Sequence, residues 1–270
     1  MSTATANDWR VTYHSLCDRG LLAGVPRSPT VTAKGLVLRC LRTLDELGYD
    51  LTHLECLSDL HLQALARFWL HTDSPELKRN ARLHALYAFV SRLSGRTPRN
   101  GVSAHVGCAR AVLAACRDAR ALCWSAIGID VDGMLRRIEL RDPYVAMQLS
   151  LQRMFGLNVT EVLGVRPHDA DRGNCLVVAG DLGARRIAIE TFEQRRVLHA
   201  AKVLAPYPGA PLHAVGTPAC DVPNRYHTAC FDAGFSLWGL GLRAHCIRFE
   251  RRFADVVAAA AAPQTAETAR

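Results

Sequence analysis

Side chains that could ligate a metal ion gather in the last quarter of the chain: Cys220, His227, Cys230, His245 and Cys246. Thiolate and imidazole are the ligands that zinc prefers, but structural zinc sites space them in short regular pairs, and this chain has no Cys-x-x-Cys. The sequence also lacks the glycine-rich loops that bind nucleotides and the Gly-x-Ser-x-Gly turn of hydrolases. We therefore expect neither a metal site nor a cofactor.

The chemistry that the composition favours is the binding of phosphate. Lysine and arginine total 33 against 25 aspartates and glutamates, which gives a formal net charge of +8 at pH 7. Arginine carries most of this charge, and its planar guanidinium matches the geometry of a phosphate group. A basic surplus of this size suits double-stranded DNA as a partner, although an arginine-rich proteome of high GC content would give the same balance.

One predicted helix carries a basic face. Ser74-Pro75-Glu76 has the order of a helix start, with an N-cap, a proline at the first position and an acid in the first turn. Lys78, Arg79 and Arg82 follow, and we expect them to contact DNA phosphates. The alternative is a charged face that only meets solvent.

Helical patterns of short length dominate the elements around these groups. We expect a mainly α chain with a small β-hairpin, hence an α+β class, organised in four parts. Residues 1–29 form an N-terminal arm, 30–100 a domain of four to five short helices, 101–262 a second domain, and 263–270 a disordered tail. The boundary follows from the glycines and prolines between residues 94 and 106.

Composition also predicts the compartment. No apolar run approaches the roughly 20 residues of a membrane span, and no basic-then-apolar leader begins the chain. The ten cysteines are scattered and several lie among Ala, Leu and Val, as buried free thiols do. We therefore expect a cytoplasmic protein without disulfides or membrane contact.

Residues 152–198 hold an ordered series of predicted elements. They are the elbow Phe155-Gly156-Leu157-Asn158 with Glu161, a helix that Pro167 ends, the turn Asp169 to Gly173, strands at 175–179 and 186–189, and a helix capped by Thr191 and Gln194. The pair Thr191 and Gln194 has the spacing of a capping box. A similar Gly-Leu step returns much later, as Leu240-Gly241-Leu242-Arg243.

This order of elements resembles the tyrosine recombinase (phage-type integrase) family, and in particular the proteobacterial integrases. In that family a Phe-Gly-Leu-Arg-x-x-Glu elbow precedes a proline, an Ala-Asp-x-Gly turn, a basic hairpin and a Thr-x-x-Gln helix, and a His-Gly-Leu-Arg-His box lies near the end. The resemblance covers about Val31 to Val257. It implies a SAM-like DNA-binding domain over 30–100, an integrase catalytic-like domain over 101–262, and a place in the bacterial cytosol or nucleoid.

The residues that the family uses for catalysis are mostly replaced. Family members cut DNA through a covalent phosphotyrosine, with an elbow arginine, a hairpin lysine and a His-x-x-Arg box in support. Asn158 stands at the elbow arginine and Leu240 at the box histidine, so that only Arg243 matches. Arg185 and Arg186 follow the hairpin lysine position, but arginine keeps its proton and is a poor general acid. We expect Arg185, Arg186 and Arg243 to bind DNA rather than to cleave it.

The resemblance and these replacements together predict a DNA-binding, integrase-like protein of a mobile element without strand cleavage, in an accessory or regulatory role. Its partners would be double-stranded DNA and either itself or a related active recombinase. Two alternatives stay open. One is an active recombinase, or one completed by a tyrosine supplied in trans, and the other is a protein-interaction subunit that kept the fold without DNA binding.

We predict that the protein forms no covalent DNA intermediate. All six tyrosines precede Arg243, whereas the family's nucleophile follows this box. Loss of one electrostatic contact costs about 10²–10³ in rate and loss of a general acid about 10²–10⁴, although such factors need not multiply. A denaturing gel on suicide substrates checks this expectation. An adduct that disappears in Tyr226→Phe would restore the enzyme.

Overall fold

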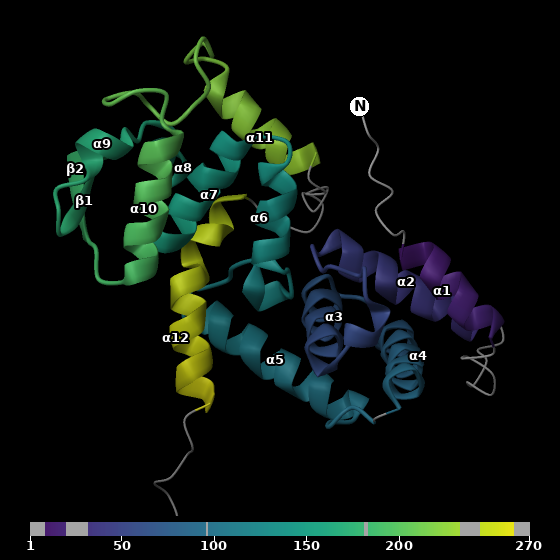
Figure 1. Ribbon diagram of the computed structural model, residues 1–270. Coiled ribbons are helices and arrows are strands. Elements are labelled where there is room, and N and C mark those ends of the chain that lie inside the picture. The colour runs from purple at the N-terminus through teal and green to yellow at the C-terminus, as the bar shows by residue number, and fades with distance from the viewer. Residues whose placement is uncertain (1–8, 20–31, 96, 181–182, 233–243, 262–270) are drawn as a thin grey trace, which may run out of the picture. The chain divides into compact units, whose positions relative to one another are not determined.

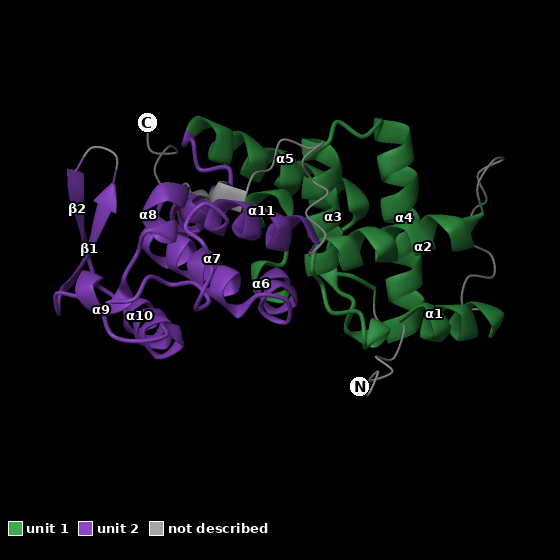
Figure 2. Ribbon diagram, turned by 90° about the horizontal axis from the view of Figure 1, so that it is seen from above, with its two compact units in different colours: residues 1–118, 125–133 green, residues 119–124, 134–270 purple. Residues whose placement is uncertain are grey.

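The computed structural model describes residues 9–19, 32–95, 97–180, 183–232 and 244–261 (Figure 1). These residues are mainly helical, with a two-stranded antiparallel sheet, which confirms the α+β class. The chain forms two compact units (Figure 2). Unit 1 holds residues 1–118 and 125–133, and unit 2 holds residues 119–124 and 134–270. In the part of the chain that is described, none of the helices combines the length and apolar character needed to cross a membrane.

Unit 1 is built from helices. They are α1 (Trp9–Asp18), α2 (Ala33–Glu46), the 3-10 helix η1 (Leu54–Cys56), α3 (Asp59–His71), α4 (Glu76–Ser94), α5 (Val102–Asp118) and the 3-10 helix η2 (Ser125–Ile127). The Thr32 side chain caps α2 by accepting from the Gly35 amide at 3.2 Å. Val37, Cys40, Leu41 and Leu44 lie on one face of α2 and are fully buried, as their helical spacing predicts.

The helix α5 belongs to unit 1, although the sequence places the domain boundary before it, at residue 100. Its buried residues Val102, Val106, Ala109 and Leu113 recur at helical spacing, and the helix packs against α3. A glycine- and proline-containing connection therefore need not separate two cores, because the helix after it can return to the first one. The expected DNA-binding domain over 30–100 remains a prediction about function.

The segment 125–133 fits closely into unit 1. The Asp130 amide donates to the Leu47 carbonyl at 2.9 Å. A Cβ added at Gly128 would lie 2.3 Å from the Ala64 carbonyl oxygen, and one at Gly133 would lie 2.1 Å from that of Gly48. Both distances are far below van der Waals contact, so these two positions require glycine while the backbones stay where they are.

Unit 2 carries the hairpin and its supporting helices. The elements are α6 (Val131–Glu139, which begins in unit 1), α7 (Pro143–Phe155), α8 (Val159–Leu163), α9 (Pro167–Ala170), β1 (Cys175–Gly180), β2 (Gly183–Ala188), α10 (Phe192–Leu204), α11 (Val222–Asp232), the 3-10 helix η4 (Ala244–Phe249) and α12 (Glu250–Ala261). Thr191 and Gln194 form the predicted capping box at the start of α10. Strand β1 pairs with β2 so that Val178 lies opposite Arg185 and Val177 opposite Arg186.

The core of unit 2 forms around the elbow. Phe155, Leu157 and Val162 are buried together with Leu151 of α7, Leu176 and Val178 of β1 and Leu198 of α10. Gly156 ends α7 in the left-handed conformation, with φ of 64°, which lets the chain turn sharply into α8. The elbow is thus a packed corner of the unit.

We predict that Phe155→Ala destabilises the protein by about 3–5 kcal/mol, as truncation of large buried aromatics does. The Phe155 side chain is 4% exposed, whereas Phe192 is 78% exposed and provides a matched control. Phe192→Ala should change stability by less than about 0.5 kcal/mol. Urea unfolding of both variants checks the prediction, and a loss below about 1 kcal/mol in Phe155→Ala would contradict it.

Candidate functional site

Asn158 acts as the N-cap of α8. Its Oδ1 accepts from the Glu161 amide at 2.7 Å, and its own amide donates to Glu161 Oε2 at 2.8 Å. The two residues thus form a reciprocal capping box, which satisfies amide donors at the start of the helix. The position where the resemblance expects a phosphate-binding arginine holds a residue that stabilises the backbone.

Glu161 is also bound from the hairpin by Arg185. The Arg185 Nε donates to Glu161 Oε1 at 2.8 Å and its Nη2 to Oε2 at 2.7 Å, and Nη2 further donates to the Gly156 carbonyl at 3.3 Å. The Glu161 side chain is 5% exposed and that of Arg185 45%. This bidentate pair fastens β2 to the elbow, and it neutralises the Arg185 charge before any phosphate approaches.

Arg186, unlike Arg185, is not held by a carboxylate of the described residues. It lies on the exposed strand β2, and its Nη2 donates to the Cys175 sulfur at 3.7 Å. Among the described residues it has no ion pair with a carboxylate, so its charge is available to an external anion. Of the two hairpin arginines named from the sequence, Arg186 is the one that the geometry leaves suited to phosphate.

The cations of α4 in unit 1 also differ from one another in exposure. Lys78 is exposed, as expected, but Arg79 is buried, with 4% exposure. The Arg79 Nη1 donates to the Ser74 carbonyl at 3.3 Å, and Nη2 lies 3.8 Å from Glu76 Oε1. Arg79 falls on the buried stripe of α4 that continues through Leu83. In this arrangement its guanidinium cannot reach a phosphate, contrary to the expectation from sequence.

Arg82 lies half-buried one turn beyond Lys78. Its guanidinium carbon is 5.2 Å from the centre of the Trp69 ring, in cation–π geometry. This contact cannot be predicted from the sequence, because Trp69 belongs to α3 and only tertiary packing brings the two side chains together. The box residues Leu240 and Arg243 lie outside the described residues.

Tyr226, the nearest alternative nucleophile, is fully buried on α11. Its hydroxyl donates to Gln152 Oε1, and Gln152 Nε2 donates to the Leu157 carbonyl at 3.2 Å. Burial raises the pKa of Tyr226 well above its ordinary value, with Cys230 contributing in the same direction and the Gln152 hydrogen bond opposing. A phenol so held is a structural hydrogen-bond donor and a poor nucleophile.

A second ionic cluster joins the acidic turn to α10. Asp171 accepts from both Lys202 Nζ and Arg195 Nη1, the latter at 3.1 Å, and from the Gly173 amide at 2.9 Å. Burial alone would raise the pKa of Asp171, but the hydrogen bonds from Lys202, Gly173 and Arg195 outweigh it and the pKa is lowered. Asp171 is therefore an ionised anchor of the turn.

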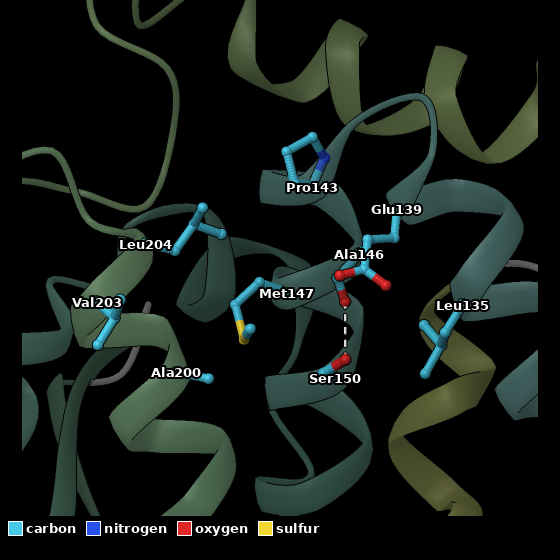
Figure 3. A pocket seen from close by; sticks show the side chains of 9 residues that line it. All are labelled: Leu135, Glu139, Pro143, Ala146, Met147, Ser150, Ala200, Val203 and Leu204. Atoms are coloured by element: carbon cyan, nitrogen blue, oxygen red, sulfur yellow. Dashed lines mark hydrogen bonds between the residues drawn. The ribbon is translucent and has the colours of Figure 1, made fainter.

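An apolar groove of about 420 Å³ runs between α6, α7 and α10 (Figure 3). Its lining consists of Leu135, Glu139, Pro143, Ala146, Met147, Ser150, Ala200, Val203 and Leu204. The Ser150 hydroxyl donates to the Ala146 carbonyl at 2.9 Å. Val203, which lines the groove, is 73% exposed, and Leu140, which follows Glu139 along the chain, is 89% exposed.

Of the cysteines that could ligate zinc, Cys220 is exposed and Cys230 is buried. Within the described ranges, no three His, Cys, Asp or Glu side chains lie close enough together to hold a metal ion. Comparisons with protein-family models, with curated proteins and with solved structures each find no match.

We predict that Arg185→Met destabilises unit 2 by about 2–3 kcal/mol. Removing one partner of a buried pair leaves an uncompensated charge and costs about 3–5 kcal/mol, a value that we lower because Arg185 is half-exposed. Arg186→Met is the matched control on the same strand and should stay within about 0.5 kcal/mol of the parent. If the two substitutions change the free energy of unfolding equally in chemical denaturation, the ion pair between Arg185 and Glu161 does not stabilise unit 2.

We predict that Asp171→Asn reduces stability near neutral pH by about 1.5–3 kcal/mol, because it removes hydrogen bonds to a charged group. Since folding lowers the pKa of Asp171, the ionised form contributes stability above the unfolded pKa near 3.9, and this contribution is lost as pH falls through the folded pKa. The variant should therefore lose less stability on acidification than the parent. Asp169→Asn, at an exposed position two residues earlier, is the matched control and should unfold thermally like the parent near neutral pH.

Proposed function

We propose that this chain is a DNA-binding, integrase-like protein of a mobile element that does not cleave DNA and has an accessory or regulatory role in recombination. The observation that carries the proposal is the joint formed by Asn158, Glu161 and Arg185. The resemblance expects catalytic cations at these positions of the elbow and the hairpin. Here Asn158 caps α8 instead, and Arg185 forms an ion pair with Glu161. The proposed fold is a SAM-like domain followed by a recombinase-like one.

The electrostatics at this joint support the absence of cleavage. A phosphoryl transition state concentrates negative charge on oxygens that need preorganised cations. The hairpin cation nearest to the elbow is already matched by the Glu161 carboxylate, and Asn158 brings no charge. Tyr226, the tyrosine nearest to the second box along the chain, is not an accessible nucleophile, because it is buried and hydrogen-bonded.

Support for DNA as the ligand comes from cations that form no ion pair within the described part of the chain. The net charge is +8, and Lys78 and Arg186 are exposed cations without an ion pair among the described residues. Cations of this kind attract the phosphate backbone regardless of base sequence. In the cell such a protein would work in the bacterial cytosol, beside a second copy or a related active recombinase.

The apolar groove favours a second candidate function, that of a protein-interaction subunit. Its volume of about 420 Å³ and the exposure of its lining residue Val203 are features of surfaces that bind apolar partners. This function needs no DNA affinity. The two candidates therefore differ in a single measurement, the affinity for duplex DNA.

A gel shift over a salt series tests the proposal. We expect the parent protein to bind duplex DNA with an affinity that falls steeply with salt, and Lys78→Ala and Arg186→Ala each to flatten the slope of log K against log salt by about one. Arg196→Ala is the control, because Arg196 is exposed but already paired with Glu193 at 2.6 Å. Absence of any shift at low salt would overturn DNA binding and leave the interaction subunit.

A further inference from the structure

We infer that Arg39 of α2 and Arg82 of α4 form a two-arginine clamp for one phosphate group, with Trp69 of α3 as its base. The inference rests on the proposed function in that the phosphate is taken to be a phosphodiester of duplex DNA. It replaces the single-helix contact surface expected from the sequence with a site shared between two helices of unit 1.

The geometry fixes one half of the clamp. The Arg82 guanidinium lies over the Trp69 ring, with 5.2 Å between its carbon and the ring centre, and Trp69 itself is 3% exposed. A buried ring cannot move aside, so the planar group above it has a restricted orientation. A guanidinium held in this way loses less conformational freedom when it binds an anion than one on a free side chain.

The second half is brought beside the first by the packing of α2 against α4. The Cys40 thiol of α2 donates to the Arg82 carbonyl of α4 at 3.4 Å. This contact places residues 39 and 40 of one helix at the level of residue 82 of the other. The three helices α2, α3 and α4 also lie side by side within unit 1 in both views (Figures 1 and 2). Arg39 is exposed, so its guanidinium is accessible from solvent.

No carboxylate among the described residues forms an ion pair with either arginine. In the described part of unit 1, acids form ion pairs with other cations, such as Asp45 with Arg10 and Glu76 with Arg79, and none pairs with Arg39 or Arg82. Burial lowers the pKa of Arg82, and the like charge of Arg39 lowers it further. Cys40 opposes this effect only as a thiolate, and burial raises the pKa of that thiol, so it is neutral at pH 7. Two cations in this state favour a shared anion.

Phosphate is the anion whose shape suits the pair. Each guanidinium presents parallel N–H donors that match two oxygens of a tetrahedral anion, and charge-assisted bonds of this kind are the strong ones. Lys78 lies one turn before Arg82 on the same side of α4 and is exposed, which would place a further cation along a nucleic-acid backbone. A carboxylate ligand would bind only one of the two guanidinium groups, so Arg39 and Arg82 together favour a phosphodiester.

Binding of a labelled duplex by fluorescence anisotropy over a salt series tests the clamp, with Arg39→Gln, Arg82→Gln and the double variant. Each single substitution should weaken binding about tenfold to a hundredfold and flatten the salt slope by about one. The double variant should show the same slope as the singles, because one phosphate is lost in each case. Arg42→Gln, one turn along the exposed side of α2, is the matched control and should keep the parent slope.

Two results of this series would overturn the clamp. A slope that falls by about two in the double variant would mean two separate phosphate contacts. Unchanged binding in all three variants would mean that Arg82 only covers Trp69. Thermal unfolding of each variant shows whether the fold is kept.

Protection from phenylglyoxal, read by peptide mass spectrometry on the unsubstituted protein, gives a second measurement that no folding defect can affect. Duplex DNA should protect both Arg39 and Arg82 from modification. If both residues are modified as fast with saturating DNA as without DNA, the clamp is overturned. Inorganic pyrophosphate serves as the second probe. If pyrophosphate protects both residues while duplex DNA fails to bind, the proposed function falls and the clamp stands as a site for free phosphates.

Discussion

The contact on which unit 2 depends is the one between Glu161 and Arg185. A two-stranded hairpin is marginal in water by itself, and β2 here is exposed along almost its whole length. Strand β1 supplies the apolar attachment to the core, while Arg185 supplies the ionic one, from the opposite strand. Since the same carboxylate also caps α8, one buried side chain holds the elbow, the short helix and the hairpin in a single arrangement.

Many of the helices and their caps could be predicted from the sequence because they depend on local patterns. The capping box of Thr191 and Gln194 and the apolar face of α2 depend on spacing along a few residues, and spacing is visible in a sequence. The elbow residues Phe155 and Leu157 are also buried, in the core of unit 2. Such elements can be predicted without knowing which other elements pack against them.

The assignment of single charges could not be predicted in the same way. Whether an arginine on α4 faces solvent depends on which side of the helix the rest of unit 1 covers, and this is decided by residues far along the chain. Arg79 is buried beside the start of its own helix, and Arg82 is stacked on a tryptophan of another helix. Glu161, the partner of Arg185, carried no signal of that role, because 24 residues separate the two in sequence.

The division of the chain into two units has a consequence for how they can be separated. The backbone passes between the units at residues 118–119, 124–125 and 133–134. Because Gly128 and Gly133 fit directly against backbone of the first unit, that unit is completed only by residues that follow an excursion into the second. A protease that cuts one connection leaves the two others intact, and a fragment that ends at residue 100 lacks part of its own core. No single cut in the chain therefore yields both units whole and separate.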